Sequence, residues 1–281
     1  MKTYVQQIML GTVTGSEEAA RATLRRVKAA GYEGLELNRF MTRPAGLLVR
    51  LLTKAAGMPT GRGGKLDWPR LMGESGLETV SYHADLGSLE REPAAVAAEA
   101  KALGTDKVVV TGMYRFDYGS EGAVKDLARR LNEAGAALKR QGLSLLYHNH
   151  NAELLFVQPN VRSYDILIDE TDAELVNFEF DSYWFAEAGA DPKIWMRRLG
   201  SRMQLWHVTD RGSRQNGPAM TPILPCDSME LGTGNMDLAG MRDIALENGV
   251  RALILESHKN WVDKDPVRSL ELSAEYLKGW K

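Results

Sequence analysis

The sequence has little cysteine, no excess of either charge and no long hydrophobic run. Cys226 is the only cysteine among 281 residues, which excludes an internal disulfide framework and fits a reducing cytoplasm. The net charge of −2 gives no basic field for nucleic acid or for an anionic membrane surface. No apolar run reaches the ~18 residues of a membrane helix, and the amino terminus lacks a signal-peptide cleavage pattern. We therefore expect a cytoplasmic protein that binds neither nucleic acid nor membrane.

What is present is the composition of an ordinary globular protein. Hydrophobic residues make up 44% of the chain and charged residues 26%, so neither disorder nor a fibrous protein is favoured. A chain of 281 residues is long for one average domain but normal for a single α/β barrel. No linker, low-complexity tract or long repeat interrupts it. One domain over residues 1–281 is predicted.

Short runs rich in β-branched or aromatic residues, bounded by turn signals, predict buried strands. They lie at residues 3–10, 34–38, 79–84, 107–113, 143–149, 175–181, 203–210 and 252–257. Longer segments with helical spacing separate most of them, for example residues 16–31, 93–104, 123–142 and 237–249. Ser16, followed by acidic residues, is typical of a helix N-cap. Eight strands alternating with helices predict a (β/α)8 TIM barrel in the α/β class.

Two inserts interrupt this alternation, and both follow predicted strands. Residues 43–70 contain an amphipathic piece and a glycine-rich loop, and residues 211–230 form an irregular segment with several prolines. Loops that follow barrel strands lie on the face where active sites are built, so we expect at least one insert to approach a bound substrate. Arg62, Arg211 and Arg214 are the inserts' candidates for binding a hydroxyl or phosphate group, with a solvated surface position as the alternative.

Metal-capable residues end four consecutive predicted strands. His148 and His150 share one face at the end of the fifth strand, and the next three strands end near Asp181, His207 and Glu256. Imidazole nitrogen and carboxylate oxygen together suit Mn²⁺, Co²⁺, Zn²⁺ or Fe²⁺ better than calcium. The simplest prediction is one divalent cation held by His148, Asp181, His207 and Glu256, with His150 as the alternative to His148 for the first ligand.

Each of these residues also has an ordinary structural interpretation. Asp181 precedes a helical pattern and is a candidate N-cap, and His258 a candidate surface residue. Glu36 and His83 end the second and third strands and give weaker signals. The coincidence of ionisable groups at four successive strand ends favours binding, because such groups are costly to keep unless something binds them.

Several segments in this order resemble one family. They are GYEGLEL (residues 31–37), YHNHNAEL (147–154), FEFDSYWFAEAGADP (178–192), HVTD (207–210), ELGTGNMD (230–237) and LILESH (253–258). Over nearly its whole length the chain resembles the sugar phosphate isomerase/epimerase superfamily, which has a xylose isomerase-like TIM barrel. The likeness is to its subgroup with a YHNH signature.

The resemblance implies one divalent metal ion, Mn²⁺, Mg²⁺, Co²⁺ or Zn²⁺, and proton transfer next to a carbonyl of a sugar or polyol. Asp181, His207 and Glu256 match the second, third and fourth ligand positions of the superfamily. Its epimerases carry a glutamate where His148 falls, and that glutamate is one of their two proton-transfer groups. Trp184 replaces a histidine that some epimerases use on substrate, and Thr209 replaces the common lysine of HVKD.

Two reactions remain open within this chemistry. An isomerase or epimerase is the first hypothesis, with His148, His150 and Glu256 as catalytic residues. A dehydratase or lyase acting by β-elimination on a keto-inositol or 3-keto-glycoside is the alternative, because elimination needs only one base, one acid and a polarised enolate. A metal-dependent endonuclease-like hydrolase would need a basic groove and more metal ligands. A catalytically inert barrel is the remaining hypothesis.

The expected partner is a small carbohydrate, and a homo-oligomer is left open. The candidate substrate-binding residues are Glu153, His83, Trp184, Glu36, Asp210 and Arg211. Glu153 lies just beyond the fifth strand, from where we expect it to reach over the metal towards substrate hydroxyls. The alternative for Glu153 is a solvent-facing loop carboxylate.

Overall fold

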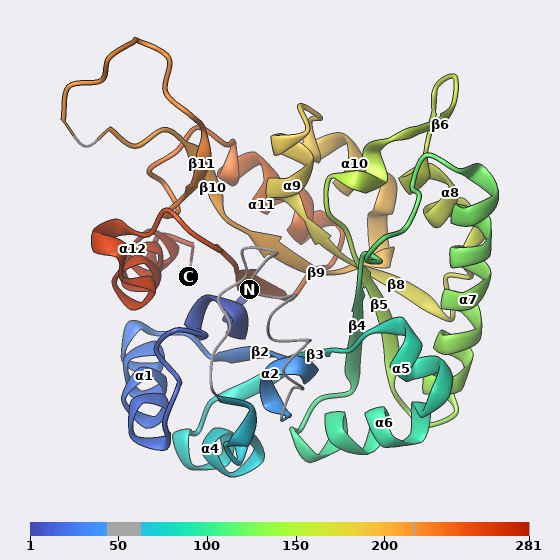
Figure 1. Cartoon of the computed structure of the whole chain (residues 1–281), viewed down its shortest axis with the longest axis horizontal. Coiled ribbons are helices and arrows are strands. Elements are labelled where there is room, and N and C mark those ends of the chain that lie inside the picture. The colour runs from blue at the N-terminus through green and yellow to red at the C-terminus, as the bar shows by residue number, and fades with distance from the viewer. Residues whose placement is uncertain (44–62, 216, 281) are drawn as a thin grey trace.

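A closed barrel of parallel strands forms the centre of the molecule (Figure 1). The computed structural model describes residues 1–43, 63–215 and 217–280. The barrel strands are β1 (Lys2–Gln6), β2 (Gly34–Asn38), β3 (Glu78–His83), β4 (Lys107–Thr111), β5 (Ser144–His148), β8 (Val176–Asp181), β9 (Met203–Val208) and β12 (Ala252–Leu255). Their order is β1-β12-β9-β8-β5-β4-β3-β2, and β1 pairs with both β12 and β2 to close the ring. The predicted (β/α)8 barrel is confirmed.

Helices surround this ring of strands (Figure 1). They are α1 (Glu17–Ala30), α2 (Arg39–Thr42), α4 (Trp68–Ser75), α5 (Leu86–Arg91), α6 (Pro93–Ala102), α7 (Glu121–Lys139), α8 (Ser163–Glu170), α9 (Ser182–Glu187), α10 (Pro192–Leu199), α11 (Leu238–Glu247) and α12 (Pro266–Lys278). Ser16 caps α1 as predicted, since its side chain accepts a hydrogen bond from the backbone N–H of Ala19. No helix in the described ranges is both long and apolar enough to cross a membrane.

The first predicted strand is shorter than the sequence pattern indicated. Its apolar run continues to Leu10, but β1 ends at Gln6 and residues 7–10 form a 3₁₀ helix. The side chain of Gln6 accepts a hydrogen bond from the backbone N–H of Ile8 and so caps this turn. Further 3₁₀ helices are η2 (Gly63–Lys65), η3 (Ala152–Leu154), η4 (Gly200–Arg202) and η5 (Val262–Lys264).

Apolar side chains occupy two regions of the core. The larger one lies between the strands and the surrounding helices, and it includes Leu24, Val110 and Phe178. The smaller cluster consists of Tyr4, Val109, Leu146, Leu205, Ala252 and Ile254. These six are barrel-strand residues, and Leu146 and Leu205 each lie two positions before a histidine of the same strand, so they share its face. The barrel interior therefore carries an apolar floor below a level of ionisable groups.

Two hairpins leave the barrel. Strands β6 (Phe156–Gln158) and β7 (Val161–Arg162) form one, and β10 (Asp210–Gly212) and β11 (Asp227–Met229) form the other. The segment between β10 and β11 extends away from the barrel (Figure 1) and exposes Met220 and Ile223. It follows β9, which confirms that the insert at residues 211–230 leaves the carboxyl end of a strand. Most of the other insert, including Arg62, lies outside the described residues.

Candidate metal centre

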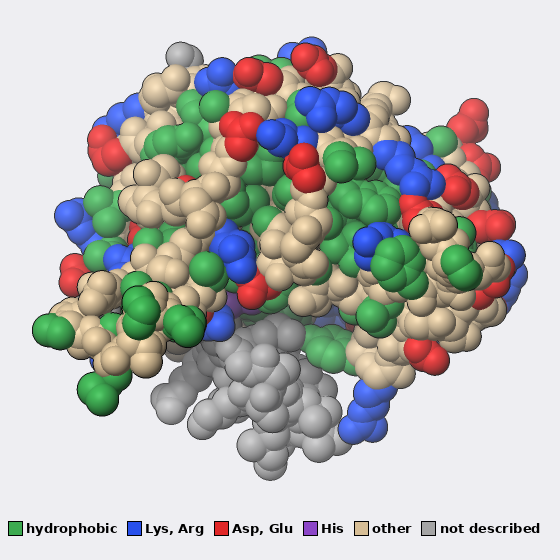
Figure 2. Space-filling view, turned by 90° about the horizontal axis from the view of Figure 1, so that it is seen from above, with side chains coloured by type: hydrophobic (Ala, Val, Ile, Leu, Met, Phe, Trp, Pro, Cys, Tyr) green, Lys and Arg blue, Asp and Glu red, His purple; other side chains and the backbone are tan. Residues whose placement is uncertain are grey.

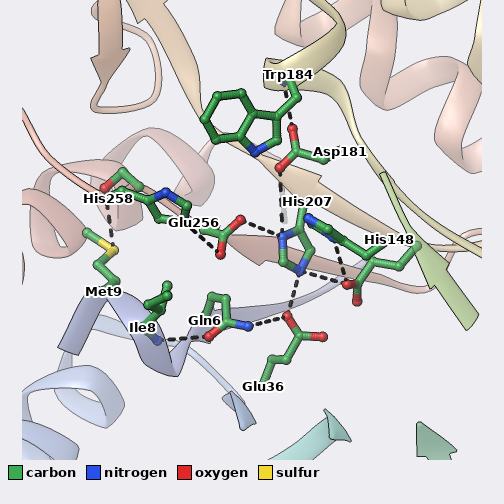
Figure 3. A network of polar contacts seen from close by, with 12 residues as sticks. Gln6, Ile8, Met9, Glu36, His148, Asp181, Trp184, His207, Glu256 and His258 are labelled. Atoms are coloured by element: carbon green, nitrogen blue, oxygen red, sulfur yellow. Dashed lines mark hydrogen bonds and ion pairs between the residues drawn. The ribbon is translucent and has the colours of Figure 1, made fainter. Parts of the chain in front are cut away.

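Two groups of ionisable side chains lie at neighbouring levels in the barrel. The upper group consists of His148, Asp181, His207 and Glu256, each with a nitrogen or oxygen atom within 4.8 Å of the others'. The lower group, Glu36, His83 and Glu179, meets the same criterion together with His207. Figure 3 shows His207 between Glu256 and Asp181 on one side and Glu36 on the other. The four residues predicted as metal ligands are therefore brought together.

The distances in the upper group leave room for a cation. The Nδ1 atom of His207 lies 3.1 Å from Oε2 of Glu256 and 3.9 Å from Oδ2 of Asp181. Two ligands of one small divalent ion, with bonds of roughly 2.1 Å, lie about 3 Å or more apart. Two imidazoles and two carboxylates supply the mixed nitrogen and oxygen donors that Mn²⁺, Co²⁺ and Zn²⁺ accept. The residues present fit such an ion.

Asp181 serves as a helix cap and also belongs to the upper group. Its Oδ1 atom accepts a hydrogen bond from the backbone N–H of Trp184, 3.0 Å away, so the predicted N-cap interpretation is confirmed. Its Oδ2 atom faces His207. The neighbouring strand fixes the backbone of Asp181, because Asn149 donates to its carbonyl and accepts from its N–H, both at 3.0 Å. The asparagine between the two histidines therefore joins the ends of β5 and β8.

Burial and charge shift the pKa values of the two carboxyls in the upper group in opposite directions. Asp181 is 3% exposed, and this burial, with the nearby Glu256 charge, raises its pKa to about 6. Burial also disfavours the charge of Glu256, but His258 and His207 outweigh it and hold the pKa of Glu256 well below its usual value. Burial thus disfavours the charge of both acids, His258 and His207 offset it at Glu256, and a divalent cation would also offset it at Asp181.

Glu179 is a member of the lower group that the sequence analysis did not select. Its Oε2 atom lies 3.0 Å from Nε2 of His83, 3.0 Å from Nδ1 of His148 and 3.2 Å from Nε2 of His207. Residues two apart on a strand share a face, so its position before Asp181 was a usable signal. Glu36 and His83, predicted as substrate-binding residues, instead contact each other at 3.0 Å at this lower level.

Two further histidines flank Trp184 at the mouth of the site. The ring of Trp184 lies 5.6 Å from the ring of His150 and 6.0 Å from that of His258, measured between ring centroids. Burial lowers the pKa of His150 to about 3. The pKa of His258 is raised, because the charge of Glu256, whose Oε1 lies 3.2 Å from its Nε2, outweighs burial. His258 therefore lies beside the upper group, with its side chain 25% exposed.

Glu153 differs from both of its sequence interpretations. It is 0% exposed, so it is not a solvent-facing carboxylate. Its Oε1 atom accepts a hydrogen bond from the hydroxyl of Tyr147 at 2.7 Å, and its Oε2 atom accepts from the backbone N–H of His150 at 3.0 Å. A Cβ atom at Gly112 would lie 3.0 Å from Oε1, so glycine leaves the space that this carboxylate fills. Glu153 supports the backbone beneath His150 instead of extending over the metal position.

Asp210 and the two arginines of the second insert also have structural partners. Asp210 accepts hydrogen bonds from the backbone N–H groups of Gly232, Gly234 and Met236 at 2.9–3.0 Å, so it fixes the loop before α11. Arg211 pairs with Glu187 at 2.6 Å, and Arg214 pairs with Glu230. Asp210 and Arg211 thus have structural partners, and their contact with substrate stays a prediction.

A pocket opens beside the upper group. Its empty volume is about 320 Å³, and its lining includes Asp181, Trp184, Glu256, His258, Asp227 and Ser228. The last two residues belong to β11 and so to the second insert. The insert therefore reaches the wall of this pocket, while its approach to a bound substrate stays a prediction.

The family model of the xylose isomerase-like TIM barrel matches residues 24–280 of this chain. Among curated proteins, inosose dehydratase of Mesomycoplasma hyopneumoniae (strain 7448) is 33% identical over 86 residues, which are 31% of this chain. The match spans only 28% of that relative's length.

Solved structures share the fold over nearly the whole chain. A sugar phosphate isomerase/epimerase from Parabacteroides distasonis ATCC 8503 is 22% identical with a TM-score of 0.76, covering 99% of this chain and 93% of its own. The IolI protein, whose structure contains a bound zinc atom, is 14% identical with a TM-score of 0.67, covering 99% and 97%. At these identities the likeness establishes the fold.

Proposed function

Because the chain belongs to the xylose isomerase-like TIM barrel family, we propose that it is a divalent-metal-dependent enzyme that enolises a sugar or polyol next to a carbonyl group. The observation that carries this proposal is the upper group, in which His148, Asp181, His207 and Glu256 converge beside an open pocket. The names of the inosose dehydratase and sugar phosphate isomerase/epimerase relatives support a carbohydrate substrate. The zinc atom of the IolI protein, which shares the fold, supports metal binding by a barrel of this kind.

The residues around the pocket supply the proton transfers that enolisation requires. A divalent ion held by the upper group would act as a Lewis acid and stabilise negative charge on the carbonyl oxygen. His150, next to Trp184, is neutral at physiological pH because burial lowers its pKa to about 3, so it would accept a proton only where negative charge on the bound substrate raises that pKa. Glu256 and His258 lie 3.2 Å apart, and His258 lies beside Trp184. This pair would return a proton to the substrate. The indole of Trp184 offers a flat apolar face to a sugar ring.

Isomerisation or epimerisation is the first candidate reaction for such an enolate. β-Elimination is the second candidate. Elimination is favoured by the asymmetry of the site, since a histidine occupies the first ligand position and the groups flanking Trp184 differ in charge. Elimination needs one base and one acid, whereas epimerisation needs matched groups on the two faces of the carbon. The inosose dehydratase relatives point in the same direction.

Deuterium exchange tests the proposal without knowledge of the final product. The zinc- or manganese-loaded protein would be incubated in D₂O with ketoses, keto-inositols and 3-keto-glycosides, and NMR would follow the hydrogen next to the carbonyl. We expect exchange with at least one compound class, and its loss after chelation. Absence of metal retention, together with no exchange on the panel, would overturn the proposal. A double bond in the product would select elimination over isomerisation.

The charge of the molecule disfavours the hypothesis of a metal-dependent endonuclease-like hydrolase. The net charge is −2. On the face shown in Figure 2, lysine and arginine side chains are interspersed with aspartate and glutamate. Binding to a phosphate backbone depends on a concentrated basic surface. A carbohydrate is therefore the substrate class that this molecule fits better.

A further inference from the structure

The lower group holds the two imidazoles of the upper group in fixed orientations. We infer that Glu36 and Glu179 are positioning residues that set which nitrogen of each histidine is free for a metal: Nδ1 of His207 and Nε2 of His148. This inference rests on the metal centre of the proposed function. It adds a role for two buried carboxylates that do not belong to the upper group.

The first step concerns His207. Its Nε2 atom lies 2.6 Å from Oε2 of Glu36, while its Nδ1 atom faces Glu256 and Asp181. Both ring nitrogens face carboxylates, which only accept hydrogen bonds, and the contact of Nε2 with Glu36 at 2.6 Å is shorter than that of Nδ1 with Glu256 at 3.1 Å. A cation bound at Nδ1 would take the place of a proton there, so the one remaining ring proton is held on Nε2 by Glu36. The lone pair of Nδ1 is then directed at the upper group. Glu36 thus selects one tautomer of His207.

Glu36 is itself held in place by two neighbouring side chains. Ser81 donates its hydroxyl to Oε1 at 2.5 Å, and Gln6 donates its amide to Oε2 at 3.1 Å. Glu36 is 0% exposed, so no water competes for these oxygens. Because Ser81 and Gln6 both donate to Glu36, its carboxylate is held as an acceptor towards His207.

The second step concerns His148. Its Nδ1 atom lies 3.0 Å from Oε2 of Glu179, so a proton held there leaves Nε2 as the free nitrogen. His83 connects the two carboxylates, since its Nε2 lies 3.0 Å from Oε1 of Glu36 and 3.0 Å from Oε2 of Glu179. The orientations of the two ligand imidazoles are therefore tied to one another through a buried network.

The lower group is better explained as hydrogen-bonded support than as a second metal site. The 2.6 Å contact between His207 and Glu36 is a hydrogen-bond distance. Two ligands of one small cation lie about 3 Å or more apart, as they do in the upper group. Carboxylates that accept from ligand histidines also raise the basicity of those ligands, and their loss commonly weakens metal binding by about 10–100-fold.

The test measures zinc affinity by competition with a chelator of known strength. Glu36→Gln and Glu179→Gln keep the side-chain shape but replace an acceptor oxygen with an N–H donor, so each should weaken zinc binding by about 10–100-fold. Glu230→Gln is the matched control, because Glu230 is a buried carboxylate in a separate network with Ser269 and Val262. It should leave the zinc affinity unchanged. Unchanged affinity in both test variants would overturn the inference while leaving the metal centre intact.

A second measurement uses the unaltered protein and so does not depend on the folding of a variant. Long-range ¹H–¹⁵N NMR of the zinc-loaded chain should show His207 bound through Nδ1 with a proton on Nε2, and His148 bound through Nε2 with a proton on Nδ1. The opposite nitrogens on zinc would overturn the inference. So would two zinc ions per chain with one lost in Glu179→Gln, because the lower group would then be a metal site. A chain that binds no zinc would overturn both this inference and the proposed function.

Discussion

The upper and lower groups contain the same types of side chain but differ in depth and spacing. In the upper group Glu256 and His258 border an open pocket, and His207 lies 3.1 Å and 3.9 Å from its two carboxylates. In the lower group Glu36 and Glu179 are 0% exposed and contact imidazole nitrogens at 2.6–3.2 Å. The two levels therefore differ in their surroundings: the deeper level is hydrogen-bonded within itself except at Oε1 of Glu179, and the outer level borders the pocket.

The largest expected effect is the loss of metal from the upper group in Asp181→Ala. The variant removes a predicted ligand, so zinc or manganese should no longer be retained through desalting, as measured by elemental analysis. It also removes the cap of α9, which typically costs about 1 kcal/mol of stability. Asp181→Asn separates the two roles, because asparagine still caps the helix. Metal retention in both variants would remove Asp181 from the ligand set.

The next effect concerns turnover at the same level. Glu256→Gln should reduce substrate deuterium exchange by about 10²- to 10⁴-fold, because it removes a predicted ligand and one proton-transfer group. His148→Ala should also lose turnover. The comparison with Glu230→Gln, which lies outside both groups, controls for the loss of a buried charge. Exchange at the parent rate in Glu256→Gln would contradict the catalytic assignment.

Glu153→Gln extends the comparison to a third buried carboxylate. One oxygen of Glu153 accepts from the backbone N–H of His150, and an amide N–H placed there would repel it. We expect turnover to fall by roughly tenfold while metal retention stays unchanged, since Glu153 belongs to neither group. Metal content and exchange rate measured on one sample separate the two effects. Full activity would show that support of His150 is dispensable.

The smallest effect is on stability. Removal of metal should leave the charge of Asp181 poorly compensated in a desolvated space, whereas the lower group keeps its internal hydrogen bonds. A ligand present at 100 times its Kd stabilises the folded state by about 2.7 kcal/mol, so chelation should lower Tm by roughly 5–10 °C. Differential scanning fluorimetry measures this shift. Asp181→Ala should show no shift on chelation, and a shift of equal size there would point to metal bound elsewhere.

The barrel and the upper group were predictable because both follow from periodicity. Eight short apolar runs separated by helical patterns fix the strand count, and the carboxyl ends of parallel strands meet on one face. Asp181, His207 and Glu256 lie at or next to such ends, so their positions in the sequence were enough to predict that they lie close together. Their roles as ligands stay predictions, as does the arrangement of the chain as one domain.

The lower group and the loop contacts were harder to predict for different reasons. Glu179 lies inside a strand, and the sequence prediction took only Asp181 from the end of that strand as a ligand. The alternation that places it beside Asp181 was available in the sequence. The partners of Asp210 and Glu153 include backbone N–H groups beyond the strand ends, whose directions depend on turns without a periodic pattern. Sequence spacing therefore suggested substrate binding for Asp210 and Glu153, whereas in the structure both accept hydrogen bonds from backbone N–H groups of loops.

The segment between β10 and β11 gives this protein a built-in position for a reporter. Cys226 is the only cysteine of the chain, it is exposed, and it precedes Asp227 and Ser228 in the wall of the pocket. One thiol reagent would therefore attach a fluorophore or spin label at a single place. Its signal would follow the occupancy of the neighbouring pocket in real time, before any substrate had been chemically identified.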